Sequence, residues 1–491
     1  MILYEINTRT WLWALSDQAG APVTLASVPD SEFAKWRELG FTHVWLMGVW
    51  TTGPLARAQA LNLPDLRRAY DDVLPGWAEG DVAGSPYAIG DYRVPPPLGG
   101  DVGLKAFRHK LHHHGLQLVL DFVPNHFGLD HPWLREQPEL FVQSPNEMPR
   151  TFAQATPAGQ RWIAHGKDPY FPPWSDTAQL DYRSSITRAA MTNLLLSIAD
   201  RCDGVRCDMA MLLLNDVFAK TWEQFPLANH QSSAAEFWPA AIAAVKEAHP
   251  GFLFLAEAYW GLEARLQELG FDFTYDKTLY DGLMARDGLG VQRHLLSLPP
   301  QALAASAHFL ENHDEPRVAA RLSPDEHRAA ALLILGLPGL RFLHDGQLSG
   351  SRVKLPVQLA RRPEEPPQPA IAEVYCRMLN VLPKSAVGRG KSRLLEPRPA
   401  WPHNPSAQNF VVVQWQLQAP GFDLVVVNLA PHRSQCYAPL TIQSLALHNW
   451  SMEDLLGPEK YARSGDDLRS QGLYLDLPPH GAQLFHFCPI N

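Results

Sequence analysis

The chain has 491 residues, of which 46% are apolar and 19% are charged, with a net charge of −9. This length predicts two or three domains, and the negative charge without a basic run argues against a nucleic-acid partner. The sequence contains no run of about 18 apolar residues, so no membrane span is predicted. The N-terminal residues show no secretory signal pattern, so we expect a cytoplasmic protein. The five cysteines form no C-x-x-C pair, and we expect them to be free thiols.

Short apolar runs rich in Val, Leu and Phe recur along the chain and alternate with helix-like segments. Most lack apolar–polar alternation, which is typical of parallel strands covered on both faces. The eight runs are Ile2–Ile6, His43–Val49, Leu116–Val123, Gly204–Asp208, Phe252–Glu257, Phe273–Asp276, Ala307–Glu311 and Gly339–Leu343. They predict an α/β fold, a (β/α)8 TIM barrel. A doubly wound open sheet is the competing architecture, although no Gly-rich phosphate loop follows the first strand.

Helix signals support the alternation. Leu104, Phe107 and Leu111 follow helical spacing, and Gly115 stands where a helix would end. A second helix is expected just after Ser184, a plausible N-terminal cap.

The third and fourth strands are unusually far apart. Asp208 follows Asp121 by 87 residues, whereas a barrel unit takes roughly 30. A Pro- and Trp-rich insertion therefore predicts a small domain, and short strands near the C-terminus predict an antiparallel β-sandwich. The expected division is 1–125 and 181–388 for the barrel, 126–180 for the inserted domain and 389–491 for the C-terminal domain. The proline-rich stretch 356–369 is either a connecting loop or a lid.

Polar residues stand where several of these strands end, which is where barrel enzymes hold their active sites. Such a concentration of charge is costly in a core unless it is paired. The residues are Asp121, Asn125, His126, Arg206, Asp208, Glu257, Asn312, His313 and Asp314.

Two of the carboxyl groups have the properties of a catalytic pair. Arg206 and Asp208 lie two apart on a strand and so share a face, and we expect the guanidinium to lower the pKa of Asp208. Glu257 follows an apolar run that should raise its pKa and keep it protonated. A carboxylate nucleophile beside a protonated acid is the equipment of a glycosidase, and a separation of about 5 Å would give retention.

These segments resemble the signature regions of the α-amylase superfamily, glycoside hydrolase family thirteen. The patterns are Asp-x-Val-x-Asn-His at 121–126, Gly-x-Arg-x-Asp at 204–208, a Glu ending an apolar strand at 257 and Asn-His-Asp at 312–314. A looser match begins at Tyr87. The four patterns occur in order, and the resemblance covers nearly the whole chain.

The resemblance implies a role for each matching residue. Asp208 would be the nucleophile, Glu257 the acid/base and Asp314 the residue that stabilises the distorted sugar. Arg206 would orient the nucleophile. The resemblance further implies that His126 and His313 bind sugar hydroxyls, that Tyr87 stacks beneath the sugar, and that Asp121 and Asn125 support the site from behind.

Other positions carry weaker or opposing signals. Arg317 is a candidate for substrate contact or for a surface ion pair. Many α-amylases have a Lys-His pair where this chain has Met211 and Leu212, so a calcium-dependent amylase is not supported and we expect no metal or cofactor. Many oligosaccharide-trimming members have Asp where this chain has Gly84, which weakens an exo-acting α-glucosidase.

Several further side chains have an ordinary structural interpretation. His112, His113 and His114 are consecutive, so they do not share a helix face and a metal site is not expected. Cys207 should face away from the nucleophile. Each of Trp133, Trp162 and Trp174 either lines the cleft or fills the inserted domain's core.

The expected substrate is an α-glucoside or malto-oligosaccharide that is hydrolysed with retention. A transglycosylase or isomerase using the same covalent intermediate is the second hypothesis, because the acceptor is chosen by the shape of the cleft. A catalytically silent carbohydrate-binding protein is the third. The oligomeric state is left open.

Overall fold

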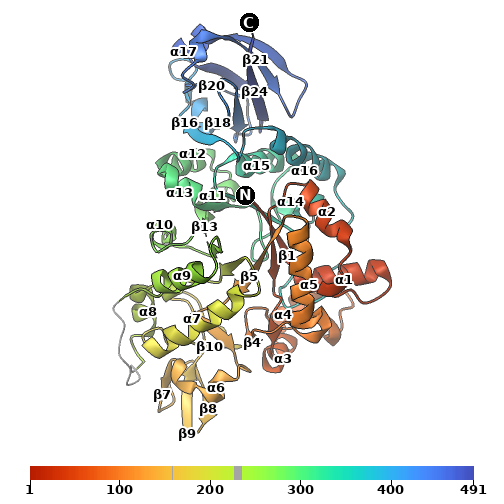
Figure 1. Ribbon diagram of the computed structural model, residues 1–491, viewed down its shortest axis with the longest axis vertical. Helices are drawn as coiled ribbons and strands as arrows, with labels where there is room; N and C mark the ends of the chain where they lie inside the picture. Colours follow the sequence, from red (N-terminus) through yellow and green to blue (C-terminus); the bar gives the residue numbers. More distant parts are fainter. Residues whose placement is uncertain (158, 226–234, 491) are drawn as a thin grey trace.

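The computed structural model describes residues 1–157, 159–225 and 235–490, and its centre is a closed barrel of eight parallel strands (Figure 1). Around the barrel the order is β1 (Ile2–Asn7), β15 (Leu340–His344), β14 (Ser306–His308), β13 (Phe273–Tyr275), β12 (Leu253–Ala256), β11 (Gly204–Cys207), β5 (Gln117–Phe122) and β2 (His43–Met47). Every predicted strand overlaps one of these. The (β/α)8 barrel is therefore confirmed and the doubly wound sheet is wrong.

Helices surround the barrel and cover the outer faces of its strands (Figure 1). The N-terminal half contributes α1 (Thr8–Ala19), α2 (Asp30–Glu38), α3 (Pro54–Asn62), α4 (Pro64–Val73), α5 (Gly100–His113) and α7 (Ser185–Ala199). The remainder are α8 (Asn215–Trp222), α9 (Phe237–Ala248), α10 (Glu263–Glu268), α11 (Lys277–Met284), α12 (Gly288–Ser297), α13 (Pro300–Ala304), α14 (Val318–Arg321), α15 (Pro324–Gly336) and α16 (Pro369–Val381).

The helix signals in the sequence are confirmed. The stripe Leu104, Phe107 and Leu111 is buried on α5. Ser184 caps α7 because its side chain accepts a hydrogen bond from the backbone N–H of Thr187, which satisfies one of the donors left free in a first helical turn.

The segment between β5 and β11 forms small antiparallel sheets outside the barrel. Its elements are β6 (His126–Gly128), α6 (Trp133–Glu136), β7 (Gln143–Ser144), β8 (Thr151–Thr156), β9 (Gly159–Ala164) and β10 (Thr177–Gln179). Strands β6 and β10 pair with each other, and β9 lies between β7 and β8. A separate ribbon joins β3 (Thr51–Thr52) to β4 (Ile89–Asp91).

The C-terminal segment forms two antiparallel sheets that enclose their own apolar core, which confirms the β-sandwich. One sheet contains β16 (Lys391–Leu395), β18 (Phe410–Gln416), β19 (Phe422–Asn428), β24 (Ala482–Ile490), β21 (Asn449–Asp454) and β22 (Lys460–Ser464). The other contains β17 (Arg398–Pro399), β20 (Ser434–Ala438) and β23 (Leu473–Leu477), and α17 (Gly465–Ser470) joins β22 to β23. This sandwich and the inserted segment lie at opposite ends of the molecule (Figure 1).

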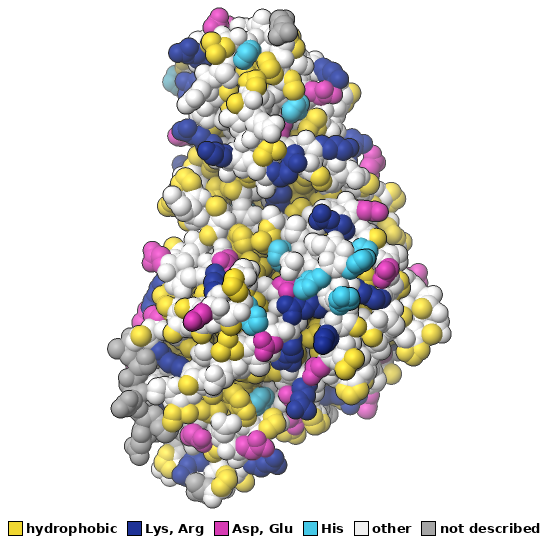
Figure 2. All heavy atoms as spheres, viewed as in Figure 1, with side chains coloured by type: hydrophobic (Ala, Val, Ile, Leu, Met, Phe, Trp, Pro, Cys, Tyr) yellow, Lys and Arg dark blue, Asp and Glu magenta, His cyan; other side chains and the backbone are white. Residues whose placement is uncertain are grey.

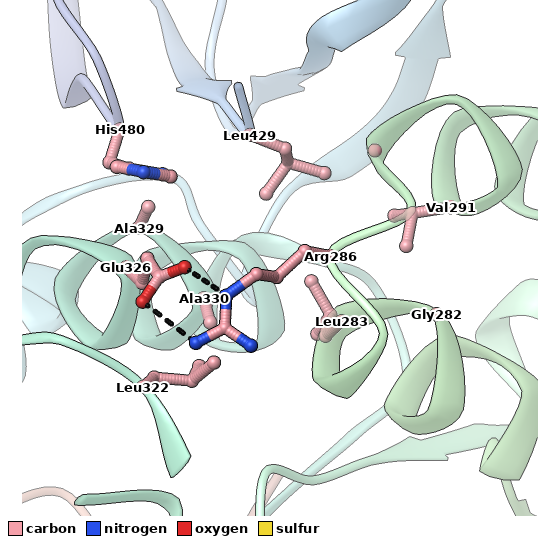
Figure 3. A pocket seen from close by; sticks show the side chains of 11 residues that line it. Gly282, Leu283, Arg286, Val291, Leu322, Glu326, Ala329, Ala330, Leu429 and His480 are labelled. Carbon is pink, nitrogen blue, oxygen red and sulfur yellow. Dashed lines mark hydrogen bonds and ion pairs between the residues drawn. The ribbon is translucent and has the colours of Figure 1, made fainter. Parts of the chain in front are cut away.

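The sandwich packs on the barrel through apolar contacts and hydrogen bonds. Trp415 Nε1 donates to the carbonyl oxygen of Gly336 at the end of α15, 2.8 Å away. Figure 3 shows another part of the interface, where Leu429 and His480 of the sandwich face α15 above the ion pair of Arg286 and Glu326. The ion pair belongs to this domain contact, on the side of the barrel wall.

Glycine at position 204 lets the strands β11 and β12 approach each other closely. A Cβ there would lie 2.6 Å from Leu253 Cβ and 2.9 Å from the Leu253 carbonyl oxygen on β12. The register pairs Arg206 with Leu255. The close packing at the strand starts thus helps to hold the ends of β11 and β12 side by side.

The proline-rich stretch 356–369 runs along the barrel surface as a pinned connection. Arg361 forms two hydrogen bonds of 2.8 Å with Asp81, and Arg362 lies 2.5 Å from Asp345. These anchors indicate a connecting segment.

Acidic and basic side chains are interspersed on the face shown in Figure 2. No described helix is long and apolar enough to cross a membrane.

Candidate active site

The ends of three adjacent strands, β5, β11 and β12, bring an arginine and three carboxyl groups together. Arg206 Nη1 donates to Asp208 Oδ1 at 2.6 Å, and its Nη2 lies 2.8 Å from Glu257 Oε2. The second contact is an ion pair without a well-directed hydrogen bond, since no N–H of Nη2 points at an acceptor. Asp121 lies 4.0 Å from Nη1. Arg206 is fully buried, so its charge is balanced by these carboxyl groups and not by water.

A sharp turn after the nucleophile candidate fixes Glu257. Met209 adopts a left-handed conformation with φ of 44°, which is uncommon for a side-chain-bearing residue. This turn aims the Met209 N–H at Glu257 Oε2, 2.7 Å away. Tyr259 donates to Oε1 of the same carboxyl group, also at 2.7 Å. Both oxygens of Glu257 are therefore held in place.

The pKa of Asp208 is shifted in the direction opposite to our expectation. Burial raises it, and the negative charge of Asp314 adds to that effect, while Arg206 opposes both without reversing them. The prediction that Arg206 lowers the pKa of Asp208 is wrong. The desolvation of this buried carboxyl group outweighs its ion pair with the guanidinium. Burial together with Asp208 and Asp314 raises the pKa of Glu257 to about 7, as the apolar run before it predicts.

The loop after β14 carries the third carboxyl group beside a buried histidine. His313 Nε2 lies 3.0 Å from Asp314 Oδ2 and 2.7 Å from the Tyr87 hydroxyl, and its Nδ1 lies 2.5 Å from Glu5 Oε1. Burial disfavours the charged ring, but Asp314 and Glu5 outweigh it and raise the pKa of His313 well above its usual value. The resulting imidazolium lowers the pKa of Asp314. Asp314 is 48% exposed, so an ionised carboxylate faces solvent.

Aromatic rings enclose the guanidinium from several sides. Its central carbon lies 5.3 Å from the ring of Trp45, 5.4 Å from Tyr87 and 5.7 Å from Tyr275. Tyr87 also stacks on His313 with ring centroids 5.2 Å apart. These rings stabilise the cation through their faces and leave it no room to rotate away. Tyr87 is only half-buried, so part of it borders the open side of the site.

His126 and Asn125 join the inserted segment to the barrel. Asn125 exchanges hydrogen bonds with Gln179 of β10. His126 packs on Trp174 with centroids 5.0 Å apart, and burial lowers its pKa to about 4. A neutral His126 at this junction can donate or accept a hydrogen bond, as a sugar hydroxyl requires. Trp174, one of the three tryptophans left open by the sequence, therefore packs on a candidate site residue.

Asp121 supports the strand ends from below. Its Oδ2 accepts a hydrogen bond from the Gly48 N–H at 3.0 Å, whereas the buried Oδ1, which faces Arg206, accepts no hydrogen bond from the described residues. Burial raises its pKa to about 7. The expected supporting role agrees with this position behind Arg206.

Arg317 is held in a buried network beside the site. Its Nη1 donates to Glu311 Oε1 and to the Asp345 carbonyl oxygen, each at 2.6 Å, and lies 2.9 Å from His344 Nδ1. It is 6% exposed, so the alternative of a surface ion pair is wrong: the ion pair is buried. Its contact with substrate stays a prediction.

The departures from the family pattern have structural reasons. Met211 and Leu212 are buried in the short helix after Asp208, where they offer no polar group to a ligand. Gly84 has φ of 89° and its carbonyl oxygen accepts a hydrogen bond from the buried Arg9. A side chain there would be strained and would meet the backbone of Arg57 at 3.0 Å. An aspartate at this position is thus incompatible with this loop.

The histidine run and Cys207 take part in packing. His112 Nε2 lies 2.8 Å from Asp203, and His114 stacks on Phe33. Cys207 is fully buried. Across the described ranges, no group of three or more His, Cys, Asp or Glu side chains is arranged to hold a metal ion. The absence of a metal or cofactor stays a prediction.

Sequence reasoning missed four residues that shape the site. Glu5 lies inside the first strand, Trp45 inside the second and Tyr275 inside the sixth, where polar or aromatic side chains facing the barrel interior were a usable signal. Tyr259 follows Glu257 by two residues in a loop, and no pattern marked it.

A large cleft of about 880 Å³ lies outside this site. It is bounded by α1, α2, α16 and the proline-rich stretch 356–369, and its lining includes Trp13, Asp17 and Glu364. It contains none of the three candidate catalytic carboxyl groups. A small pocket lined by His313 and Lys354 shares Arg317 and Asp345 with this cleft.

Known proteins resemble this chain over most of the barrel. Residues 35–354 match the family model described as alpha amylase, catalytic domain. The chain is 25% identical over 284 residues to the alpha-amylase MalA of Haloarcula japonica, and the match covers 56% of this chain and 38% of that protein. It is 29% identical over 249 residues to an alpha-1,4-glucan:maltose-1-phosphate maltosyltransferase of Burkholderia pseudomallei, covering 49% of this chain and 18% of that protein.

These curated relatives are longer than the match, which spans less than two fifths of either. Among solved structures, a maltogenic alpha-amylase, AmyB, from Thermotoga neapolitana superposes with a TM-score of 0.68 at 17% identity. That superposition covers 100% of this chain and 99% of the other. The solved structure shows a shared fold from end to end.

Replacing the buried cation tests its role in stability. Arg206→Met should lower the free energy of unfolding by about 3–5 kcal/mol at pH 7, because it leaves buried carboxyl groups without a counter-charge. The loss should be smaller at pH 5, where Glu257 and Asp121, both with pKa near 7, are protonated. Chemical denaturation at both pH values measures the difference.

Arg286→Met is the matched control, because its ion pair with Glu326 is half-exposed. It should cost less than about 1 kcal/mol. A similar cost for both variants, or a cost for Arg206→Met that does not change with pH, would contradict the charge-balance account.

Proposed function

This chain belongs to the alpha-amylase family, and on that premise we propose that it is a retaining glycosidase that cleaves α-glucosidic bonds in malto-oligosaccharides or related α-glucosides. The observation that carries the proposal is the single guanidinium of Arg206, which contacts both Asp208 and Glu257. One guanidinium spans a short distance, so the two carboxyl groups lie close together. That favours the separation of about 5–5.5 Å found in retaining enzymes.

In the first step, the Asp208 carboxylate attacks the anomeric carbon and Glu257 donates its proton to the leaving oxygen. The pKa of Glu257 near 7 keeps much of it protonated at neutral pH. Arg206 orients Asp208 and stabilises its ionised form. The Met209 N–H and the Tyr259 hydroxyl hold the Glu257 carboxyl group in position for the proton transfer.

In the second step, Glu257 takes a proton from the incoming water, which displaces Asp208 from the covalent intermediate. The ionised Asp314 stabilises the positive charge that develops on the sugar ring in both steps. Glu5 holds the Nδ1 side of His313, and its Nε2 lies beside Tyr87 and Asp314, so these three polar groups together would meet the sugar hydroxyls. The proposal places the reaction in a site without metal, in a cytoplasmic enzyme.

Loss of the nucleophile tests the proposal directly. Asp208→Asn should lower turnover of maltose, maltotriose or sucrose by roughly 10⁴-fold or more, because an amide cannot form the glycosyl ester. Product chromatography and a thermal melt of the same sample separate lost chemistry from lost folding.

Glu263→Gln is the control, since Glu263 lies on the helix that follows the same strand as Glu257 and has no proposed role. It should keep wild-type activity. Substantial activity in Asp208→Asn would overturn the nucleophile assignment. Sugar binding by the wild-type protein without turnover of any α-glucoside would instead support a silent carbohydrate-binding protein.

The pH dependence tests the acid/base assignment. The rate should fall as pH rises through about 7, because Glu257 then loses the proton that it must donate. The Tyr259 hydrogen bond lowers the pKa of Glu257, so Tyr259→Phe should move the alkaline limb to higher pH. The measurement is kcat/KM against pH.

Tyr70→Phe provides the comparison, because its hydroxyl donates to the Ala60 carbonyl oxygen far from the carboxyl cluster. It should leave the alkaline limb in place. A limb that moves to lower pH in Tyr259→Phe would contradict the assignment.

A transglycosylase is the second candidate, and one feature favours it. Tyr170 of the inserted segment and Trp260, three residues after Glu257, meet edge to face with centroids 4.9 Å apart. They are 66% and 39% exposed, and Trp260 has a left-handed backbone with φ of 64°. Exposed aromatic faces suit the apolar face of an acceptor sugar. The maltosyltransferase relative is a transfer enzyme by name.

The aromatic pair predicts a shift in product ratio. Trp260→Ala should lower the yield of longer or isomeric sugars relative to glucose by about 2- to 10-fold, because the acceptor loses its contact while water does not. Chromatography of maltotriose reactions measures the ratio. Trp401→Ala, at a tryptophan of the sandwich domain that is 51% exposed, should leave the ratio unchanged. An unchanged ratio in Trp260→Ala would remove this support for transfer.

A further inference from the structure

A cluster of reactive side chains lies in the C-terminal sandwich, separate from the active site. On β24, His486 and Cys488 are two residues apart and share one face of the sheet. His486 Nε2 lies 2.9 Å from Cys488 Sγ, and its Nδ1 lies 2.6 Å from Asp423 Oδ1 on the paired strand β19. A thiol, an imidazole and a carboxylate are thus connected in series.

The carboxylate decides which ring nitrogen carries the proton. Asp423 is 2% exposed, and its other oxygen accepts a hydrogen bond from the Ala386 N–H in the connection between barrel and sandwich. An ionised carboxylate can only accept, so His486 Nδ1 must donate to it. Nε2 of the neutral ring is then left with a lone pair directed at the thiol. The Cys488 S–H donates to that lone pair.

The charges around the cluster keep the thiol protonated at rest. Burial and the carboxylates of Asp423 and Glu453 raise the pKa of the Cys488 thiol. The hydrogen bond to Asp423 raises the pKa of His486, which makes the ring a stronger base. Glu453 on β21 is itself paired with Lys460 at 2.9 Å. The thiolate therefore forms when His486 takes the proton during a reaction.

Accessibility distinguishes this cysteine from most of the others. Cys488 and Cys376 are exposed, whereas Cys202, Cys207 and Cys436 are buried. Within the part of the chain that the structure describes, Cys376 has a hydrogen bond from the Asn380 side chain, at 3.4 Å, and no imidazole beside it. The chain thus contains one exposed cysteine with a base and one without.

We propose that Cys488 is a reactive thiol that exchanges with low-molecular-weight disulfides and thereby forms a mixed disulfide on the C-terminal domain. The assignment rests on the Asp423–His486–Cys488 geometry and on the exposure of the sulfur. Nucleophile, base and orienting carboxylate within hydrogen-bond distance are the arrangement that activates cysteine for attack.

The exchange is balanced in atoms and electrons. The Cys488 proton moves to His486 Nε2 as the sulfur attacks one sulfur of the disulfide. A new S–S bond forms, the old S–S bond breaks, and its electron pair leaves with the second sulfur as a thiolate. The imidazolium returns the proton to that thiolate. One disulfide is consumed and one mixed disulfide and one thiol are produced.

The test measures the rate of modification of the full chain by hydroxyethyl disulfide at pH 7, with peptide mapping by mass spectrometry. Cys488 should react about 10-fold or more faster than Cys376 in the same molecule. His486→Gln should remove that advantage and leave the rate of Cys376 unchanged. Asp423→Asn, which keeps an oxygen for the Ala386 N–H, should lower the Cys488 rate as well.

The dependence of the rate on pH separates base assistance from a structural effect. In the wild type the Cys488 rate should level off once His486 is neutral. In His486→Gln it should keep rising towards the pKa of an unassisted thiol, about 8.5 or above. The acidic groups facing His486 are Asp423 and Glu453.

Two results would overturn the proposal. One is a Cys488 rate no greater than that of Cys376. The other is a His486→Gln variant with the wild-type rate and the wild-type pH profile. If His486→Gln fails to fold in a thermal melt, Asp423→Asn and the Cys376 comparison decide the question in its place.

Discussion

The buried guanidinium of Arg206 is the contact on which the active site depends. Asp208, Glu257 and Asp121 end three neighbouring strands of a barrel, and a closed barrel keeps those ends within a few ångströms of one another. Carboxyl groups crowded this way, with little water, would repel each other and remain protonated. A single cation among them allows part of the negative charge to persist. The surrounding aromatic rings fix that cation in place.

A second charged network supports the opposite side of the site. Glu5 inside the first strand and Asp314 after the seventh both act on His313, which lies between them. The positive ring keeps Asp314 ionised although that carboxylate is near the other acids. The two networks give the carboxyl groups different tasks: Asp314 carries a stable charge, and Glu257 can release and regain its proton near neutral pH. This difference is what the proposed two-step reaction requires.

The outer domains contribute to function in different ways. The inserted segment is tied to the barrel through Asn125 and Gln179, and it brings Tyr170 to Trp260, three residues after Glu257. In our proposal, the contact between Tyr170 and Trp260 decides whether water or a sugar is the acceptor. The sandwich instead packs against the barrel wall through Trp415. Its Cys488 cluster therefore lies in a different domain from the candidate active site.

The sequence alone determined the order of the strands, the end of the barrel that bears the carboxyl groups and the pairing of Arg206 with Asp208. These follow from local patterns, because strand parity and strand ends depend on neighbouring residues only. Only the tertiary structure decided the raised pKa of Asp208 and the contact of His313 with Glu5, 308 residues away. It also decided the meeting of Tyr170 with Trp260. The degree of burial and the contacts between distant segments arise when the barrel closes, and no short stretch of sequence contains them.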